Sequence, residues 1–576
     1  MSENEGTIGY IVGGNLQDGL RVRLTVPAAD LQEGSFVVCD SDHWRFYGLV
    51  TDLELGATDP RFADEHLDRL HPALAQLLYG QTLFTTMEVY STLMLDRGPE
   101  DPGARLRWQA DIDSGQAERP APRPVKTVPA HHAPVRLADA GDVAEIFGRD
   151  DPGSLVIGHT LEQGYPVRLD LARFVKRSAG IFGATGTGKS FLARIMLAGL
   201  IQAGSTDARM ASVLVFDMHN EYGFDDTDEN ENPVRGLRSL FGGRVQVAAL
   251  GKGSQVRTKN PDFTLEIGMR DLLPRDILML SEALSLTDKA ADVLSALWRD
   301  FSDGWFIEFM SMQPGLVIET DDGKKIPAPN SPAGWARSAG IHESSAEALH
   351  RSLLRRLGDR DYLVRDPAMD AVEAVVDQLE NGRHVVLSFG KYESDLDYLL
   401  VSNILTRRIR GRWVKKTEQY RSGAVEGAPR PLVIVVEEAH KLLNPSLSNQ
   451  TAFGIIAREL RKYMVTLLII DQRPSGIDDE VMSQLGTRIT GWLGDEDDIR
   501  AVLTGLSGRD KLRGMLARLR EKEEVLLLGW GVRMPIPVKS RRYDQGFWDE
   551  MRAGRRGPDS GDVLNERIND ELLPWA

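Results

Sequence analysis

Residues 183–190 of this 576-residue chain read GATGTGKS, which fits the phosphate-binding loop pattern G-x-x-x-x-G-K-[ST] at each fixed position. The apolar residues 179–182 predict a strand before the loop, and residues 191–197 predict a helix after it. Glycine-rich backbone wraps its N–H groups around phosphates, and the N-terminus of the following helix adds partial positive charge. The chain is therefore expected to bind a nucleoside triphosphate.

The loop pattern predicts a role for individual residues of the ATP site. Lys189 is expected to reach the β- and γ-phosphates, and the Ser190 hydroxyl to hold the Mg²⁺ that bridges them. The residues predicted to bind ATP are Gly183, Ala184, Thr185, Gly186, Thr187, Gly188, Lys189, Ser190 and Phe191.

Length and composition limit what surrounds the loop. A chain of this length predicts roughly two to four domains. With 42% hydrophobic and 27% charged residues, the composition is that of a globular protein. No run approaches the ~20 apolar residues of a membrane span, and the first residues lack a basic and apolar signal segment, so a cytoplasmic protein without a membrane partner is expected. The single cysteine, Cys39, excludes an intrachain disulfide and is expected to be a buried strand residue.

The N-terminal region, residues 1–152, predicts a small β-barrel followed by a linker. Short apolar or alternating runs are separated by Gly, Asp and Asn turns, at 9–12, 20–26, 35–39, 44–50 and 82–95. Residues 64–78 have a helical pattern. The proline-rich and charged residues 99–134 predict an extended linker.

From residue 153 onward, strands and helices alternate, which predicts an α/β fold: a RecA-like P-loop core with a mostly parallel sheet covered on both sides. Its buried strands are predicted at 212–217, 245–250, 385–389, 432–436, 466–470 and 524–528. A helical insertion without strands is expected at 270–378, with helices at 271–284 and 288–301 and a loop at 320–340. The remaining predicted boundaries divide the core into 153–269 and 379–550 and leave a C-terminal tail at 551–576.

Two carboxylates follow the apolar run 432–436. Glu437 and Glu438 would lie at the carboxyl end of a buried strand, where ligands of such sheets bind. Glu437 is expected to contact Mg²⁺ directly or through water, and Glu438 to orient and deprotonate the attacking water. The alternative is that both acids stabilise the start of the next helix.

Two further strand ends and one basic helix complete the predicted site. Gln472 is suited to hydrogen-bond the γ-phosphate or the attacking water. His219 and Glu221 are candidates for a supporting shell, with a purely structural turn as the alternative. Arg458 and Arg461 could stabilise charge on the γ-phosphate of a neighbouring subunit, although helix capping is an equal alternative for both.

The net charge of −16 does not exclude a nucleic-acid partner, because binding needs only a local basic strip. Each basic cluster is compatible with DNA binding but more often is a solvated or salt-bridged face. The clusters are Arg351, Arg355, Arg356 and Arg360; Arg407, Arg408, Arg410, Arg412, Lys415 and Lys416; and Lys252, Arg257 and Lys259, the last being a candidate channel loop.

The motifs GATGTGKS, DMHNEYG, VVEEAHKLL, ARELRKY and DQRPSGID, in this order, resemble the HerA family of hexameric DNA-translocating ATPases, which is related to the FtsK type. GYIVGG and WRFYGLV resemble that family's N-terminal HAS barrel. The resemblance implies a homo-hexameric ring on double-stranded DNA with ATP sites between subunits, and it adds Arg177 as a basic residue near phosphate. Two departures are Glu437 in place of the usual aspartate and Asp471 where relatives often have serine.

The resemblance also implies a partner nuclease, because no nuclease motif is evident in this chain. The partner would be NurA-like in DNA end processing and repair, or a sirtuin-like or other nuclease effector in antiphage defence. An ATPase ring that scaffolds an effector without moving DNA is the alternative function. A conjugation-type or secretion coupling ATPase is disfavoured because no run of the sequence is expected to form a membrane segment.

Overall fold

The computed structural model describes residues 6–41, 43–57, 83–99, 101–151, 153–207, 210–256, 259–321, 323–448 and 451–553. The chain folds into two compact units. Unit 1 comprises residues 1–174, 181–189 and 486–541. Unit 2 comprises residues 175–180, 190–485 and 542–576. Residues 486–541 thus belong to the same compact unit as the N-terminal residues, whereas the sequence analysis placed residues 486–541 in the ATPase core. The domain boundaries at 152, 269, 378 and 550 stay predictions.

Unit 1 contains the predicted barrel, which is closed. Its strands are β1 (Thr7–Asn15), β2 (Gly19–Leu24), β3 (Phe36–Ser41), β4 (Trp44–Ala57), β5 (Leu83–Asp96), β6 (Arg123–Pro124) and β7 (Pro134–Leu137). The sheet order β2-β1-β7-β3-β4-β5 is closed by antiparallel pairing of β2 with β5, which leaves β6 on the outside of β5. All pairs are antiparallel, as the short turns between runs predict.

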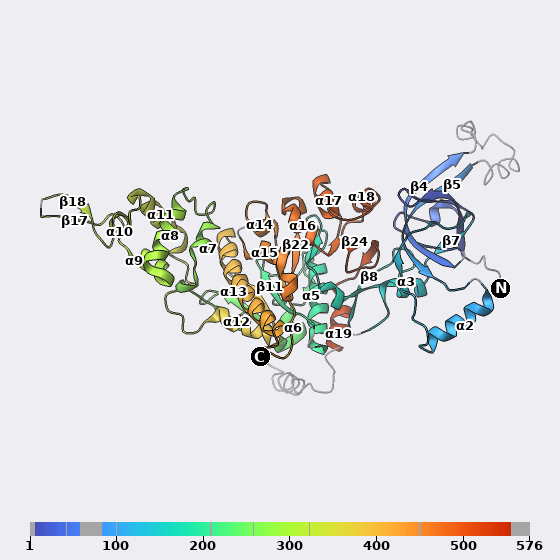
Figure 1. Cartoon of the computed structure of the whole chain (residues 1–576), viewed down its shortest axis with the longest axis horizontal. Coiled ribbons are helices and arrows are strands. Elements are labelled where there is room, and N and C mark those ends of the chain that lie inside the picture. The colour runs from blue at the N-terminus through green and yellow to red at the C-terminus, as the bar shows by residue number, and fades with distance from the viewer. Residues whose placement is uncertain are drawn as a thin grey trace. The chain divides into compact units, whose positions relative to one another are not determined.

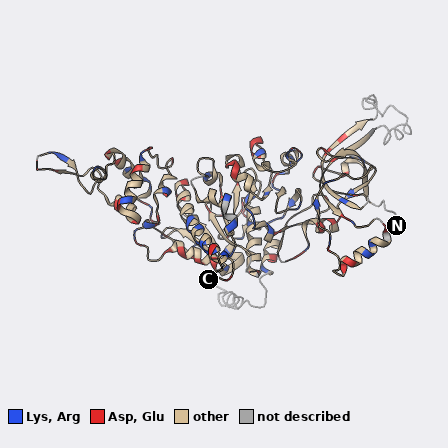
Figure 2. Cartoon of the chain, viewed as in Figure 1, with Lys and Arg blue, Asp and Glu red and all other residues tan. Residues whose placement is uncertain are grey.

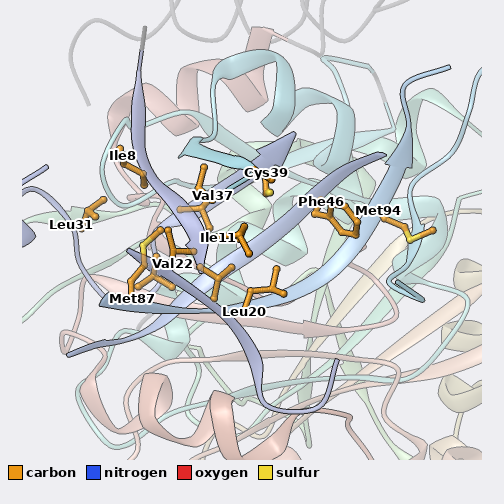
Figure 3. Packing of buried hydrophobic residues seen from close by; sticks show 14 residues of the cluster. Ile8, Ile11, Leu20, Val22, Leu31, Val37, Cys39, Phe46, Met87 and Met94 are labelled. Carbon is orange, nitrogen blue, oxygen red and sulfur yellow. The ribbon is translucent and has the colours of Figure 1, made fainter. Parts of the chain in front are cut away.

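Alternate residues of the barrel strands point inward and form its core. Figure 3 shows Ile11, Val22, Val37, Phe46 and Met94 converging on the interior. Cys39 lies among them on β3 and is 5% exposed, which confirms its prediction as a buried strand residue. The helix predicted at 64–78 lies outside the described residues.

The rest of unit 1 is an antiparallel sheet with flanking helices. The sheet order is β23-β24-β25-β8-β9, and the helices are α2 (Pro102–Asp113), α3 (Ala140–Phe147), α4 (Leu171–Phe174), α17 (Glu496–Leu503) and α18 (Arg509–Arg518). The strands are β8 (Ser154–His159), β9 (Pro166–Asp170), β23 (Thr487–Thr490), β24 (Glu524–Gly529) and β25 (Ile536–Ser540). The strand predicted at 524–528 is therefore antiparallel to both neighbours, a distinction that an apolar run does not encode.

The extended linker predicted at 99–134 is wrong over 102–113, which form α2. The Asp101 side chain accepts a 2.7 Å hydrogen bond from the Ala104 N–H, and Pro102 occupies the first helical turn. An N-cap followed by proline is a strong helix start, and it outweighed the high charge and proline content of the segment.

Unit 2 contains the parallel sheet predicted for the core. Its order is β15-β14-β20-β11-β21-β22, and each pair is parallel. The strands are β11 (Ser212–Asp217), β14 (Val245–Leu250), β15 (Phe263–Leu265), β20 (His384–Ser388), β21 (Leu432–Glu437) and β22 (Val465–Asp471). The carboxyl ends of β11, β20, β21 and β22 lie at one edge, because neighbouring strands in this order run in one direction.

Helices pack around this sheet. They are α5 (Lys189–Thr206), α6 (Leu237–Phe241), α12 (Ala371–Glu380), α13 (Asp395–Arg421), α14 (His440–Leu443), α15 (Ala452–Glu459), α16 (Asp479–Gln484) and α19 (Gln545–Ala553). The fold is thus the predicted RecA-like P-loop class with an N-terminal barrel. Among the described residues, none of the helices combines the length and apolar character that a membrane crossing requires.

Residues 270–378 are mainly helical, and Figure 1 shows α8–α11 grouped to one side of the sheet strands β11 and β22. The helices are α7 (Pro274–Leu278), α8 (Ala290–Phe301), α9 (Trp305–Ser311), α10 (Pro332–Ala339) and α11 (Glu343–Leu357). Three short strands also occur there, so the expectation of no strands is wrong: β17 (Val317–Glu319), β18 (Lys325–Pro327) and β19 (Leu363–Val364).

Two further predictions for this region need correction. The helix predicted at 271–284 is only α7, since Pro274 disfavours helix in the residue before it. The loop predicted at 320–340 contains β18 and α10, because the Ser331 side chain caps the Gly334 N–H at 3.0 Å and Pro332 begins the helix.

Candidate nucleotide-binding and hydrolysis site

The GATGTGKS loop follows β10 (Ala179–Phe182) and leads directly into α5, as predicted. Gly186 and Gly188 have φ angles of 80° and 88°, a backbone conformation that favours glycine and lets the loop curl. The Thr187 hydroxyl and the Lys189 ammonium both donate to the Ala184 carbonyl at 2.8 Å, which holds the lysine over the loop. Such a curled loop at a helix N-terminus directs N–H groups toward an anion.

Glu437, the last residue of β21, is buried, and only one of its two carboxylate oxygens has a hydrogen-bond partner among the described residues. Its side chain is 5% exposed. Oε1 accepts a 2.8 Å hydrogen bond from the Tyr222 hydroxyl, whereas Oε2 has no hydrogen-bond partner among the described residues. Burial, together with the neighbouring carboxylates Asp217 and Glu221, raises the pKa of Glu437 well above its usual value. A cation at Oε2 would stabilise the ionised form.

The turn after β11 supports Glu437 from the adjacent strand end. Asp217 is fully buried and accepts hydrogen bonds from the N–H groups of Glu221 at 2.7 Å and Tyr222 at 2.9 Å. Burial raises the pKa of Asp217 to about 6, although these backbone hydrogen bonds act in the opposite direction. From α5, Arg194 donates to the Glu221 carbonyl at 2.5 and 3.2 Å, which fixes the turn beside the helix that follows the loop.

The predicted supporting residues of this turn differ in their surroundings. Oε2 of Glu221 is buried and has no hydrogen-bond partner among the described residues, while His219 is exposed. The charge of Glu221 therefore raises the pKa of Glu437, whereas His219 lies at the surface of the same turn.

Glu438 follows β21 with a φ of 46°, a left-handed conformation that is unusual for a residue other than glycine. Gln472, at the end of β22, donates through Nε2 to Oε2 of Glu438 at 3.3 Å. The structure thus brings together the two residues that the sequence predicted to handle the attacking water. Backbone strain of this kind is concentrated at functional sites in proteins.

The three candidate arginines have different environments. The Arg458 guanidinium contacts the Ser448 carbonyl at 3.0 Å and the Glu480 carboxylate at 3.4 Å within its own chain. Arg177 is partly exposed in the segment before β10. The side chain of Arg461 lies outside the described residues, and a role in a neighbouring subunit stays a prediction for all three.

Comparisons with known proteins find similarity to one group of helicases. The family model described as Helicase HerA, central domain, matches residues 155–409. The DNA double-strand break repair helicase HerA of Sulfolobus acidocaldarius is 24% identical over 543 residues, covering 93% of this chain and 94% of that protein. The HerA protein of Saccharolobus solfataricus is 23% identical, with coverage of 93% and 92%. This chain is therefore similar to HerA helicases over most of its length.

Similar solved structures include VirB4 and a bacterial conjugative coupling protein. VirB4 of Thermoanaerobacter pseudethanolicus aligns over 69% of this chain and 99% of its own, with 18% identity and a TM-score of 0.43. The bacterial conjugative coupling protein TrwB aligns over 71% and 93%, with 13% identity and a TM-score of 0.42.

The residues present fit a magnesium ion that is bound mainly through nucleotide phosphates. Among the described residues, no group of three His, Cys, Asp or Glu side chains is arranged to hold a metal. Mg²⁺ in nucleotide sites typically uses one or two protein oxygens in addition to phosphates and water. The buried, unpartnered Oε2 of Glu437 is a donor of this type.

Four of the six residues of the largest predicted basic cluster, Arg407, Arg408, Arg412 and Lys416, form ion pairs with carboxylates. Figure 2 shows acidic positions on α12 beside the basic positions of α13. Arg412 pairs with Glu373, Asp377 and Glu380, and Lys416 pairs with Glu380. Arg407 and Arg408 likewise pair with Asp276, Asp271 and Asp370, and Arg360 pairs with Asp397. These arginines pair with carboxylates of their own chain.

The residues of the two other basic clusters form fewer ion pairs within the described part of the chain. Arg351, Arg355 and Arg356 are exposed on α11 and have no ion pair to a described residue. In the candidate channel loop, Lys252 pairs with Glu266 at 3.3 Å and Lys259 lies 5.6 Å from the Phe224 ring, while Arg257 lies outside the described residues. The channel role of this loop stays a prediction.

Sequence reasoning missed several residues that build the site. Tyr398, within α13, donates to the Glu437 carbonyl at 2.9 Å, and no motif indicated it. Tyr222 and Arg194 were also overlooked, although Tyr222 stands in the DMHNEYG motif. His440 contacts Asp471, a pairing that only the alignment of β21 beside β22 reveals.

Proposed function

We propose that this chain is the ATP-hydrolysing subunit of a DNA translocase or helicase. The observation that supports the proposal most directly is the buried Glu437 carboxylate, whose Oε2 has no hydrogen-bond partner in the described part of the chain. Glu438 follows it and accepts a hydrogen bond from Gln472. Carboxylates at the carboxyl end of a buried strand, in a chain with a phosphate-binding loop, are the machinery of nucleoside triphosphate hydrolysis. The relatives named as DNA repair helicases support DNA as the substrate.

In this mechanism the loop residues 183–190 bind the phosphates, with Lys189 on the β- and γ-phosphates and Ser190 on Mg²⁺. When bound, the metal neutralises charge that develops on the phosphates. Glu437 would hold the metal through its Oε2 atom, directly or through water. Glu438 orients and deprotonates the attacking water, and Gln472 orients the same water or the γ-phosphate.

The assembly and its partners are further parts of the proposal. A homo-hexameric ring would encircle double-stranded DNA, with Arg177, Arg458 or Arg461 of one subunit approaching the ATP of the next. Arg458 would have to exchange its contacts with Ser448 and Glu480 for phosphate. A NurA-like nuclease, or a sirtuin-like or other defence effector, would cut DNA in trans, in end processing or antiphage defence.

The decisive experiment measures ATP hydrolysis and ATP-dependent displacement of a triplex-forming strand by the purified chain. Lys189→Ala is expected to abolish nucleotide binding and both activities, and Glu438→Gln to retain binding while abolishing both. Hydrolysis without strand displacement or duplex unwinding would favour the scaffold function instead. Sizing the protein with and without nucleotide tests the hexamer.

A further inference from the structure

A hydrogen-bonded link joins the ends of β21 and β22 immediately beside Glu438. Asp471, the last residue of β22, is 1% exposed. It accepts hydrogen bonds from the His440 N–H at 2.7 Å, from Nδ1 of His440 at 3.0 Å and from the Arg473 N–H at 2.7 Å. His440 is therefore held by both its backbone and its side chain against a buried carboxylate.

This link reaches the carboxylate that is proposed to activate water. Nδ1 of His440 lies 3.7 Å from Oε2 of Glu438, the same oxygen that accepts from Gln472. The Glu438 carboxylate is thus approached by two groups, both of which are anchored to the end of β22. The left-handed backbone at Glu438 and the direct connection Glu438-Ala439-His440 keep the two side chains close.

The charges around His440 favour its imidazolium form. The pKa of His440 is raised, first by its hydrogen bond to Asp471 and further by the charges of Asp471 and Glu438, while burial and Lys441 oppose the shift. Lys441 itself is engaged by Asp395 at 2.7 Å, which reduces its repulsion. The described groups around the ring are thus two carboxylates, from the ends of β21 and β22, and one paired lysine.

We propose that His440, fixed by Asp471, is a positioning residue that sets the orientation of the Glu438 carboxylate for attack on the nucleotide. This inference rests on the proposed function of Glu438. His440 does not contact the substrate; it acts through Glu438, and Asp471 acts through His440. Gln472 and His440 together tie the geometry of the water-activating group to the end of β22.

The test compares His440→Ala, His440→Asn and Asp471→Asn by steady-state ATP hydrolysis. His440→Ala and Asp471→Asn are expected to lower kcat by roughly 10- to 100-fold with KM within about twofold, as for other residues that orient a catalytic group. His440→Asn retains an amide donor toward Asp471 but cannot carry charge. It is expected to recover part of kcat. Wild-type kcat is expected to decline at alkaline pH, where His440 loses its proton, and the His440→Asn variant is expected to lack this decline.

Three controls separate the possible outcomes. His342→Asn, at an exposed histidine before α11, is expected to leave kcat unchanged. Thermal melting and binding of a fluorescent ATP analogue identify variants that fail to fold or to bind. The double variant His440→Asn with Asp471→Asn is expected to be no worse than the more damaging single variant, because the two residues act as one unit.

Different results would overturn the positioning role of His440 and the proposed role of Glu438 in ATP hydrolysis. If Glu438→Gln abolishes hydrolysis while His440→Ala stays within twofold of wild-type kcat, His440 has no positioning role. If His440→Asn restores both the full kcat and the wild-type pH profile, His440 is only a structural link, and the inference is equally overturned. Full hydrolysis by Glu438→Gln would instead overturn the proposed function itself.

Discussion

The hydroxyl of Tyr222 donates a 2.8 Å hydrogen bond to Oε1 of Glu437, 215 residues away in the sequence, and so joins the turn after β11 to the end of β21. This hydrogen bond lowers the pKa of Glu437, whereas burial and the adjacent acids raise it. Tyr222 therefore helps to keep the proposed metal ligand ionised. Since Mg²⁺ binds the carboxylate and not the carboxylic acid, the hydroxyl should affect the metal requirement of the enzyme.

Replacement of Tyr222 by phenylalanine is expected to raise the Mg²⁺ concentration for half-maximal ATP hydrolysis by roughly tenfold, the cost of one hydrogen bond to a charged group. The effect should be larger at pH 6 than at pH 8, because a higher pH ionises Glu437 in the variant. Magnesium titrations of ATPase activity at both pH values measure it. Tyr543→Phe, which removes a hydroxyl bonded to the Arg235 carbonyl, is the matched control and should leave the titration unchanged.

The left-handed backbone at Glu438 predicts that stability and activity can be separated at this position. Glycine adopts a φ of 46° without a Cβ penalty, so Glu438→Gly should raise the free energy of unfolding by about 1 kcal/mol while abolishing hydrolysis. Glu438→Gln should abolish hydrolysis without that gain. Urea unfolding of the three proteins, with ATPase assays, tests the pair; a Gly variant less stable than the Gln variant contradicts it.

The sequence predicted the elements that position the site because each has a local signal. The strands β11, β21 and β22 are long apolar runs, and the loop before α5 is a motif whose glycines have a conformational reason. Glu437, Glu438 and Gln472 follow directly from the ends of those strands. Local patterns were therefore sufficient to place these three residues at the ends of neighbouring strands, and their roles stay predictions.

The contacts that tune those residues depend on tertiary packing and have no local signal. Tyr398 reaches the Glu437 carbonyl from within the 27-residue helix α13. Asp471 meets His440 only because β22 is parallel to β21 in a particular register. The missed helices α2 and α10 are a different case. Their N-cap and proline signals are present in the sequence, but the prediction gave more weight to the polar composition of the two segments.

The pairing of α13 with α12 predicts that Arg412 contributes to stability and not to DNA binding. Arg412→Ala should lower the free energy of unfolding by up to about 1 kcal/mol, since its partners are partly exposed. DNA affinity should stay within about twofold, with an unchanged slope against salt concentration. Loss of a phosphate contact would reduce that slope by about 1. A DNA-binding titration at several salt concentrations tests this prediction. Arg351→Ala, at an exposed arginine with no ion pair to a described residue, provides the comparison.

Acid sensitivity of the core is expected to arise in part from His384, the first residue of β20. The side chain is 2% exposed, and its Nδ1 has no hydrogen-bond partner among the described residues. Burial, reinforced by the charges of Arg430 and Arg244, lowers the pKa of His384 from 6.5 to about 3. The unfolded chain therefore binds a proton below pH 6.5 that the folded chain rejects, so stability falls as the pH decreases from 6.5 toward 3.

Between pH 8 and pH 5 this histidine should account for a loss of about 2 kcal/mol in the free energy of unfolding. His384→Leu removes the titration, so the stability of the variant relative to wild type should improve by that amount at pH 5. Urea unfolding at the two pH values measures the change. His342→Asn, at an exposed histidine, should show no such pH-dependent change, and a wild-type-to-Leu difference that is equal at both pH values would show that His384 is not the titrating group.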